Sequence, residues 1–462
     1  MKKNSLICLL ISLSFASSAM AEEVKLIACQ NSVEMIDYGL DLIEQAQQSI
    51  EFSPCFFGGE VCQKYLAAIE KRMKLNKRLQ VYVMLAMTLM EDKDKVYMDQ
   101  IEGLYPRQFH VVYTTSVIDI SKDLSAIDNH VKMLVVDERY FTVGGTNYDD
   151  SMCTDGSAPV ERHDKPGVSG FVAANLPSGS RDQDLIGKSQ LIARELRQIF
   201  HKLFALWTDY NIGKRFTSKD PSAFIDKWIF SEIDPYKRPY VKRFENDENA
   251  IVIDSSKIQI FLGTPVANPN PITQAYCHLI NEAKQEIEIG NLYFSPVDTI
   301  MDALKDASNR GIKITVVTNG IHDHSPSYTK LFAWANRISY LPIVYGRDFH
   351  MWEKGKCKNT TENAVAFYEY DVDDILYHKK IMVVDKRYLV IGSFNLGHRS
   401  DMSDYEIAIV IDSEELTMNA LKPLNKDLTH SLKVSSEQMQ DWYFDPIIFY
   451  KAEVQKIFHS LM

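Results

Sequence analysis

The stretch "YHKKIMVVDKRYLVIGSFN", from Tyr377 to Asn395, joins two strand-like apolar runs to a set of polar residues. Because strand residues alternate between faces, His378 and Lys380 point the same way while the valines that follow can face a core. The second apolar run ends on Gly-Ser-x-Asn, where Ser393 adds a hydroxyl and Asn395 an amide. A histidine, a cation, a hydroxyl and an amide are therefore predicted near two adjacent strand ends. This grouping suits an anion such as phosphate.

The same arrangement occurs earlier in the chain, in "NHVKMLVVDERYFTVGGTN" at residues 129–147, with a constant offset of 248 residues. Agreement at so many fixed positions excludes chance, and it predicts two copies of one unit. The matching residues are His130 and His378, Lys132 and Lys380, Asp137 and Asp385, Gly144 and Gly392, and Asn147 and Asn395.

The repeat extends beyond these stretches. "LIEQAQQSIEF" at residues 42–52 reappears as "LINEAKQEIEI" at residues 279–289, and in each copy a helical segment and another apolar strand follow. Alternating strands and helices predict an α/β layer architecture. We predict an N-terminal domain at 22–245 and a C-terminal domain at 246–462, divided at the polar "RFENDENA". A Gly/Ser/Pro-rich insertion at 151–180 predicts a loop that can act as a lid beside the site.

The N-terminus, "MKKNSLICLLISLSFASSAMAEE", has a basic tip, a short apolar run and a small-x-small end. These features predict a signal peptide at residues 1–21 and an exported protein, periplasmic or secreted. No other segment is long and apolar enough to span a bilayer. The mature chain keeps six cysteines, whose pairing cannot be deduced from sequence.

The repeated residues resemble the signature of the phospholipase D superfamily, which is His-x-Lys, four residues, Asp, six residues and Gly-Ser-x-Asn, normally present twice. Residues 377–411 look most like the cardiolipin-synthase branch. The resemblance implies two similar α/β/α sandwich domains that face each other across one shared active site. It also implies covalent catalysis, in which one histidine attacks phosphorus and the other protonates the leaving alcohol. Family analogy favours His130 as the nucleophile and His378 as the acid and base.

The resemblance carries a set of site residues onto this chain. The catalytic set is His130, Lys132, Asp137, His378, Lys380 and Asp385. The lysines neutralise the phosphodiester, whereas the two aspartates are expected to brace the site. Asn147, Ser393 and Asn395 are expected to donate to phosphate oxygens. Glu406 and Asp184, on the following strands, are the candidates to hold the second ring nitrogen of each histidine. Gly145 replaces the serine of the signature, which leaves the first copy one donor fewer.

The function implied is that of an exported phospholipase D-type phosphodiesterase or phosphatidyltransferase acting on glycerophospholipids. A nuclease of the same superfamily and a non-catalytic binding protein are the alternatives. The net charge of −11 and a single modest basic cluster favour a phospholipid over nucleic acid as the partner, with peripheral contact to a membrane. Phe56, Phe57, Tyr293 and Phe294 are expected to border its acyl or glycerol side. No metal, other cofactor or protein partner is indicated, and the headgroup and the acceptor alcohol stay open.

Overall fold

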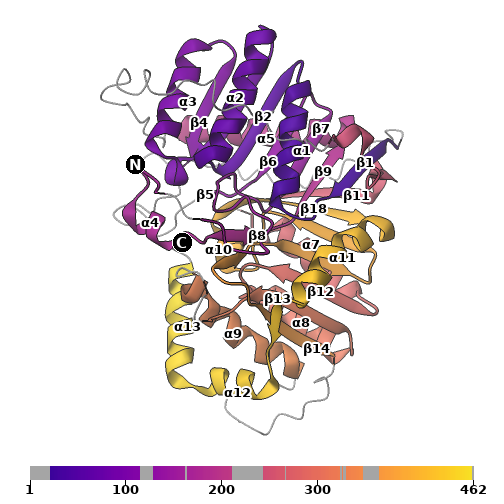
Figure 1. Ribbon diagram of the computed structural model, residues 1–462. Coiled ribbons are helices and arrows are strands. Elements are labelled where there is room, and N and C mark those ends of the chain that lie inside the picture. Colours follow the sequence, from indigo (N-terminus) through magenta and orange to yellow (C-terminus); the bar gives the residue numbers. More distant parts are fainter. Residues whose placement is uncertain are drawn as a thin grey trace, which may run out of the picture.

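The computed structural model describes residues 21–114, 128–161, 164–210, 243–265, 267–322, 325, 329–346 and 364–459 (Figure 1). Residues 1–20 of the predicted signal peptide and Cys357 lie outside this part. Five cysteines of the mature chain lie in the described part, and none of them forms a disulfide there. None of the helices in the described ranges is both long enough and apolar enough to cross a membrane.

The first half is built on an eight-stranded mixed sheet with the order β10-β1-β9-β7-β6-β2-β3-β4. Its strands are β1 (Glu23–Ala28), β2 (Ser49–Phe56), β3 (Gln80–Ala86), β4 (Phe109–Thr114), β6 (Met133–Val136), β7 (Tyr140–Gly144), β9 (Asp184–Lys188) and β10 (Ile251–Asp254). The neighbours β2, β3 and β4 are parallel, and the other pairs are antiparallel.

The second half repeats this sheet in the order β11-β18-β17-β16-β12-β13-β14-β19. Its strands are β11 (Ile258–Gly263), β12 (Glu286–Asn291), β13 (Lys313–Asn319), β14 (Val365–Tyr370), β16 (Lys380–Val384), β17 (Tyr388–Gly392), β18 (Asp404–Asp412) and β19 (Ser431–Lys433). Seven strands therefore follow the same order in both sheets. The predicted α/β class and internal repeat are confirmed.

The boundary between the halves differs from the predicted 245/246. Strand β10 still belongs to the first sheet, so the chain crosses between Asp254 and Ile258, through the turn η3 (Ser255–Lys257). The polar segment chosen as the boundary instead forms a turn, η2 (Phe244–Asn246), whose Phe244 is fully buried against the first half. Polar composition marked a turn there and not the end of a domain.

Helices cover both sheets (Figure 1). The helices of the first half are α1 (Ser32–Gln45), α2 (Gly59–Leu75), α3 (Asp92–Leu104), the short α4 (Gly170–Asn175) and α5 (Gln190–Tyr210). Those of the second half are α7 (Pro271–Glu282), α8 (Asp298–Asn309), α9 (Thr329–Tyr345), the short α10 (His398–Met402), α11 (Glu414–Leu428), α12 (Ser436–Phe444) and α13 (Pro446–His459). Helices α1–α3 pack on one face of the first sheet, and α7–α9 with α12 and α13 on one face of the second.

A third hydrophobic core joins the two halves. It combines residues of α5 and α11 with the remaining faces of both sheets, including Leu26 of β1 and Ile407 of β18, both 0 % exposed. Each fully buried aliphatic side chain contributes roughly 1.5–3 kcal/mol. A continuous core of this kind fixes the two halves relative to each other, which a site shared between them requires.

Two short parallel strand pairs also cross between the halves. Strand β5 (Asp128–Asn129) pairs with the start of β18, and β15 (Ile375–Tyr377) pairs with β8 (Gly179–Arg181). The predicted insertion at 151–180 thus contains α4 and ends in β8 instead of being loop throughout. Strand β5 ends directly before His130, and β15 ends directly before His378.

Candidate active site

The two histidines are each held by a carboxylate from the other half of the molecule. Nδ1 of His130 lies 2.9 and 3.0 Å from the two carboxylate oxygens of Glu406, and Nδ1 of His378 lies 2.5 Å from Oδ2 of Asp182. The side chains of His130 and His378 are 15 % and 5 % exposed. Neither half therefore contains a complete histidine–carboxylate pair, and the crossed pairs make one composite site.

The backbone explains why each histidine meets its carboxylate. The N–H of His130 donates to the carbonyl of Tyr405 at 3.0 Å, and that of His378 to the carbonyl of Arg181 at 2.8 Å. These bonds continue the short parallel pairs β5–β18 and β15–β8 by one residue. The carbonyl that accepts each bond belongs to the residue directly before the carboxylate, so the side chains of the next residues come together.

The carboxylates also decide the tautomer. An acceptor at Nδ1 keeps the proton on that nitrogen and leaves the lone pair of Nε2 available for chemistry. Burial first, and then the charges of Lys132 and Lys380, hold the pKa of both imidazoles well below the ordinary histidine value. Burial raises the pKa of Asp182 to about 6 and that of Glu406 to about 7. At neutral pH the site thus offers neutral imidazoles.

The two signature lysines are almost completely buried beside the histidines. Lys132 is 2 % and Lys380 is 1 % exposed, and each ammonium donates to the backbone carbonyl of its own motif's histidine. Burial lowers the pKa of Lys380 to about 7. Because an isolated buried ammonium is costly, an anion that enters between two of them is strongly stabilised.

The two signature asparagines occupy equivalent positions and keep unused hydrogen-bonding capacity. Asn147 is 1 % and Asn395 is 7 % exposed. Within the described part of the chain, the amide oxygen of each has no hydrogen-bond partner. Buried amides normally satisfy both ends, so these two oxygens are suited to accept a hydrogen bond from a donor such as a substrate hydroxyl.

Ser393 has a different role from the predicted one. Its hydroxyl donates to Oε2 of Glu406, and Ser400 of α10 donates to Oε1 of the same carboxylate at 2.5 Å. A buried carboxylate needs donors, and these two hydroxyls fix the rotamer in which Glu406 meets His130. Ser400 was missed because it follows the signature, and only the turn into β18 brings it back to the carboxylate.

Asp184 was predicted to hold a histidine, but the residue that does so is Asp182. The carboxylate of Asp184 instead accepts from the hydroxyl of Thr146 at 2.5 Å and from its N–H at 3.1 Å. Burial and the nearby charge of Asp182 raise the pKa of Asp184 to about 7. Asp184 thus supports the turn that leads to Asn147.

The sheet register explains this difference. Asp184 lies opposite Gly144, whereas in the second sheet Ala408 lies opposite the corresponding glycine. Glu406 stands two residues before Ala408, so its counterpart in the first half is Asp182. Since residues two apart on a strand share a face, a shift of two residues leaves the apolar–polar pattern unchanged. The pattern alone could not distinguish the two aspartates.

The glycine that replaces the signature's serine has a steric reason. A Cβ at Gly145 would lie 2.5 Å from Oδ1 of Asp182 and 3.0 Å from Cδ of Lys380. The shorter Asp182 sits against the backbone where the second copy has room for Ser393 and the longer Glu406. The hydroxyl that the first copy lacks would therefore serve as a hydrogen-bond donor to the carboxylate and not to phosphate.

Asp137 and Asp385 lie away from the chemistry, in contrast to their place in the predicted catalytic set. Their carboxylates accept backbone N–H groups of residues 47–49 and 284–286, at 2.6–3.0 Å. Five residues separate Asp137 from Lys132 along an extended strand, which is about 16 Å. Both aspartates have positive φ, +57° and +53°, which short polar residues tolerate. They brace the start of a strand at the far end of each sheet.

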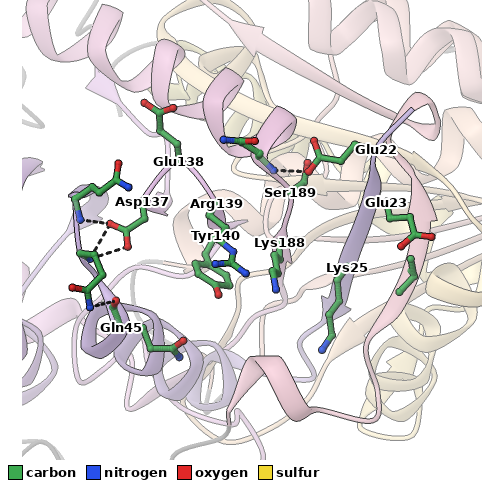
Figure 2. A pocket seen from close by; sticks show the side chains of 14 residues that line it. Glu22, Glu23, Lys25, Gln45, Asp137, Glu138, Arg139, Tyr140, Lys188 and Ser189 are labelled. Atoms are coloured by element: carbon green, nitrogen blue, oxygen red, sulfur yellow. Dashed lines mark hydrogen bonds between the residues drawn. The ribbon is translucent and has the colours of Figure 1, made fainter. Parts of the chain in front are cut away.

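A polar pocket of about 720 Å³ opens at this far end of the first sheet (Figure 2). Asp137 and Arg139 line it together with Lys188 and Glu22, and neither histidine nor signature lysine reaches it. Some of its charged groups already have partners, since Glu22 accepts two N–H groups from the start of α5 and Lys188 pairs with Glu245 at 2.7 Å. This pocket is separate from the candidate active site.

Of the aromatic residues predicted to border the substrate, Phe57 and Phe294 are fully buried. Each lies in the core between the sheet of its own half and the helices that pack on that sheet. Phe56 and Tyr293, the first residues of the two aromatic pairs, are half-buried and pack against a small apolar cluster that contains Leu376. Successive residues of an extended segment face opposite sides, so only one member of each pair can face the space between the halves.

Among the described residues, one group of side chains has the spacing of a metal site, namely His130, Asp404 and Glu406, with ligand atoms within 4.8 Å of one another. Both oxygens of Glu406 are taken by hydrogen-bond donors, and Asp404 pairs with Arg399 at 2.9 Å. An ion there would compete with these partners and withdraw His130 from catalysis. The residues do not call for a resident metal.

Comparison with known proteins points to the same family as the signature residues do. Residues 276–428 match the family model described as "Cardiolipin synthase, PLD-like domain". The chain is 26 % identical over 223 residues to cardiolipin synthase A of Buchnera aphidicola, covering 48 % of this chain and 39 % of that protein. It is 25 % identical over 183 residues to cardiolipin synthase 1 of Staphylococcus epidermidis, covering 40 % and 32 %. The chain thus spans about two fifths or less of the length of these relatives.

The fold has a solved counterpart that covers nearly the whole chain. The crystal structure of phosphatidylserine synthase from Haemophilus influenzae superposes with a TM-score of 0.63 and covers 95 % of both chains at 14 % sequence identity. At this identity the likeness establishes the two-sheet fold alone.

Proposed function

Because this chain is a member of the phospholipase D superfamily, in its cardiolipin-synthase-like branch, we propose that it displaces an alcohol at the phosphodiester of a glycerophospholipid. It acts as a phospholipase D-type phosphodiesterase or phosphatidyltransferase through a phosphohistidine intermediate. The observation that carries the proposal is the pair of crossed histidine–carboxylate contacts, His130–Glu406 and His378–Asp182.

In the first step, Nε2 of one histidine forms a bond to phosphorus as the bond to the leaving alcohol oxygen breaks. The other histidine, protonated at Nε2, gives its proton to that oxygen. The negative charge of the bound phosphodiester offsets Lys132 and Lys380, which raises the imidazolium fraction of this acid. The carboxylate at Nδ1 stabilises the positive charge that each imidazole acquires.

In the second step, an incoming alcohol or water gives its proton to the second histidine, now neutral. Its oxygen bonds to phosphorus, and the phosphorus–nitrogen bond breaks. Family analogy favours His130 as the nucleophile and His378 as the acid and base. Water as the acceptor gives hydrolysis, and a lipid or glycerol hydroxyl gives transfer.

A phospholipid suits the charge of the site. A single phosphodiester is neutralised by two buried lysines, whereas a nuclease that follows a polyanion needs a wide cationic groove. The net charge of this chain is −11. Half-buried Phe56 and Tyr293 offer apolar surface for the glycerol or acyl side, from equivalent positions of the two halves.

We expect the purified protein to release or exchange headgroups of phospholipids in mixed vesicles, with little cleavage of single- or double-stranded oligonucleotides at two salt concentrations. Lipid products are identified by mass spectrometry, with glycerol added to detect transfer, and each arm is repeated with chelator, which should leave the rate unchanged. The His378→Ala variant is the negative control in each assay. Efficient cleavage of oligonucleotides that the variant lacks, beside inert vesicles, would move the assignment to a nuclease.

We also propose that the protein is exported, supported by the basic tip, the apolar run and the small residues around position 21. N-terminal sequencing of the chain recovered outside the cytoplasm should begin at Glu22. An uncleaved chain confined to the cytoplasm would refute this.

A further inference from the structure

Lys379, which stands between His378 and Lys380, is a buried cation that the catalytic steps do not use. Its side chain is 0 % exposed, and Nζ lies 2.5 Å from Oδ2 of Asp427, near the end of α11. Because neighbouring residues of an extended segment face opposite sides, this ion pair anchors the segment on the side opposite to the His378 side chain.

Asp427 is shared with a second cation from the other half of the molecule. Nε of Arg181 lies 2.7 Å from Oδ1 of Asp427, and the two side chains are 7 % and 1 % exposed. Nη1 of Arg181 donates to the carbonyls of Gln30 and Asp155, at 3.1 and 3.0 Å. Arg181 is thus held by residues of its own half as well as by Asp427 of the second half.

Arg181 is also the residue directly before Asp182. It is the last residue of β8, at the end of the insertion, and its own carbonyl accepts the N–H of His378. Lys379 and Arg181 are therefore the chain neighbours of His378 and Asp182, and Asp427 links the two cations.

The other histidine lacks this arrangement. Val131 stands where the second copy has Lys379, and Tyr405 stands where the first half has Arg181. A feature present at one histidine and absent from the other is not demanded by the repeated fold.

We propose that Lys379, Asp427 and Arg181 form a positioning cluster that keeps Asp182 ionised and aligned with His378 across the boundary between the halves. The inference rests on the proposed function, since it concerns the same reaction. Two cations against one carboxylate leave a surplus positive charge behind Asp182. That charge favours the carboxylate, which alone can accept the proton of Nδ1.

The electrostatics of Asp182 agree with this role. The titratable groups that face it are His378, Lys132, Lys379, Lys380 and Asp184. Burial raises its pKa to about 6, and the three lysines work against that rise. Burial also lowers the pKa of Lys379 to about 8, so Lys379 is charged at neutral pH and below.

The test is Lys379→Met, which leaves a neutral Arg181–Asp427 pair and no buried unpaired charge. Removing a positive charge makes proton uptake by the His378–Asp182 pair easier. The midpoint of its titration should therefore rise by about 0.5–1 pH unit. The midpoint is read from histidine resonances in the NMR spectrum of isotope-labelled protein, with His378 assigned by its loss in His378→Gln. The acidic limb of kcat/KM should move up by a similar amount, with Lys379→Arg restoring both.

Lys386→Met is the matched control, because Lys386 pairs with Glu286 on the surface and is 51 % exposed. This variant should leave the midpoint unchanged. The proposal is overturned if Lys379→Met titrates as the wild type does, or if Lys379→Arg fails to restore the wild-type midpoint. The NMR readout needs no substrate, so these outcomes stand apart from any failure of the lipid assay.

Discussion

His130→Ala and His378→Ala should each reduce turnover by about 10⁴-fold or more, and the double variant should be little slower than either. In the proposed mechanism the two imidazoles act as one unit. Without the nucleophile no phosphohistidine would form, and without the acid the alcohol would not leave. Their crossed contacts with Glu406 and Asp182 place both in a single site. Steady-state rates on phospholipid vesicles provide the measurement.

Two controls separate this loss from damage to the fold. His278→Ala, at an exposed position of α7, should keep full activity. Asp137→Ala removes a carboxylate of the signature that accepts backbone N–H groups far from the histidines. It should lower the free energy of unfolding by about 1–3 kcal/mol and leave kcat nearly unchanged. Near-normal turnover in either active-site histidine variant would refute the two-histidine mechanism.

Asp182→Asn and Glu406→Gln should each lower kcat by roughly 10²–10⁴-fold with little change in unfolding free energy. An amide is nearly isosteric with the carboxylate, but it cannot stabilise an imidazolium and permits the tautomer with the proton on Nε2. In that tautomer the reactive nitrogen has no lone pair to attack phosphorus or to take up a proton. The pH dependence of kcat/KM and the yield of acid-trapped phosphoenzyme report the defect.

Asp184→Asn is the discriminating control for this prediction. It stands two residues after Asp182, at the start of β9, but its partner is Thr146. We expect activity within a few-fold of the wild type, with some loss of stability from the weakened turn before Asn147. If Asp184→Asn lost activity as severely as Asp182→Asn does, the geometric assignment of the carboxylate would be wrong.

Several features of this protein follow from the sequence by itself. Two copies of His-x-Lys and Gly-x-x-Asn at one spacing, each inside an apolar strand pair, predict the repeated α/β unit and the chemistry of an anion site. These signals are local, because a strand's alternation and the identity of its polar residues do not depend on what packs against it. The histidines, lysines and asparagines could therefore be named in advance.

The partners of those residues were decided only by the tertiary structure. Which carboxylate meets His378 depends on strand register, and a shift of two residues exchanges Asp184 for Asp182 without altering the pattern. That Ser393 serves Glu406 depends on a contact across neighbouring strands. That Lys379 meets Arg181 through Asp427 depends on how the two halves pack. Contacts between segments far apart in the chain arise from the global packing of both halves, which no local pattern encodes.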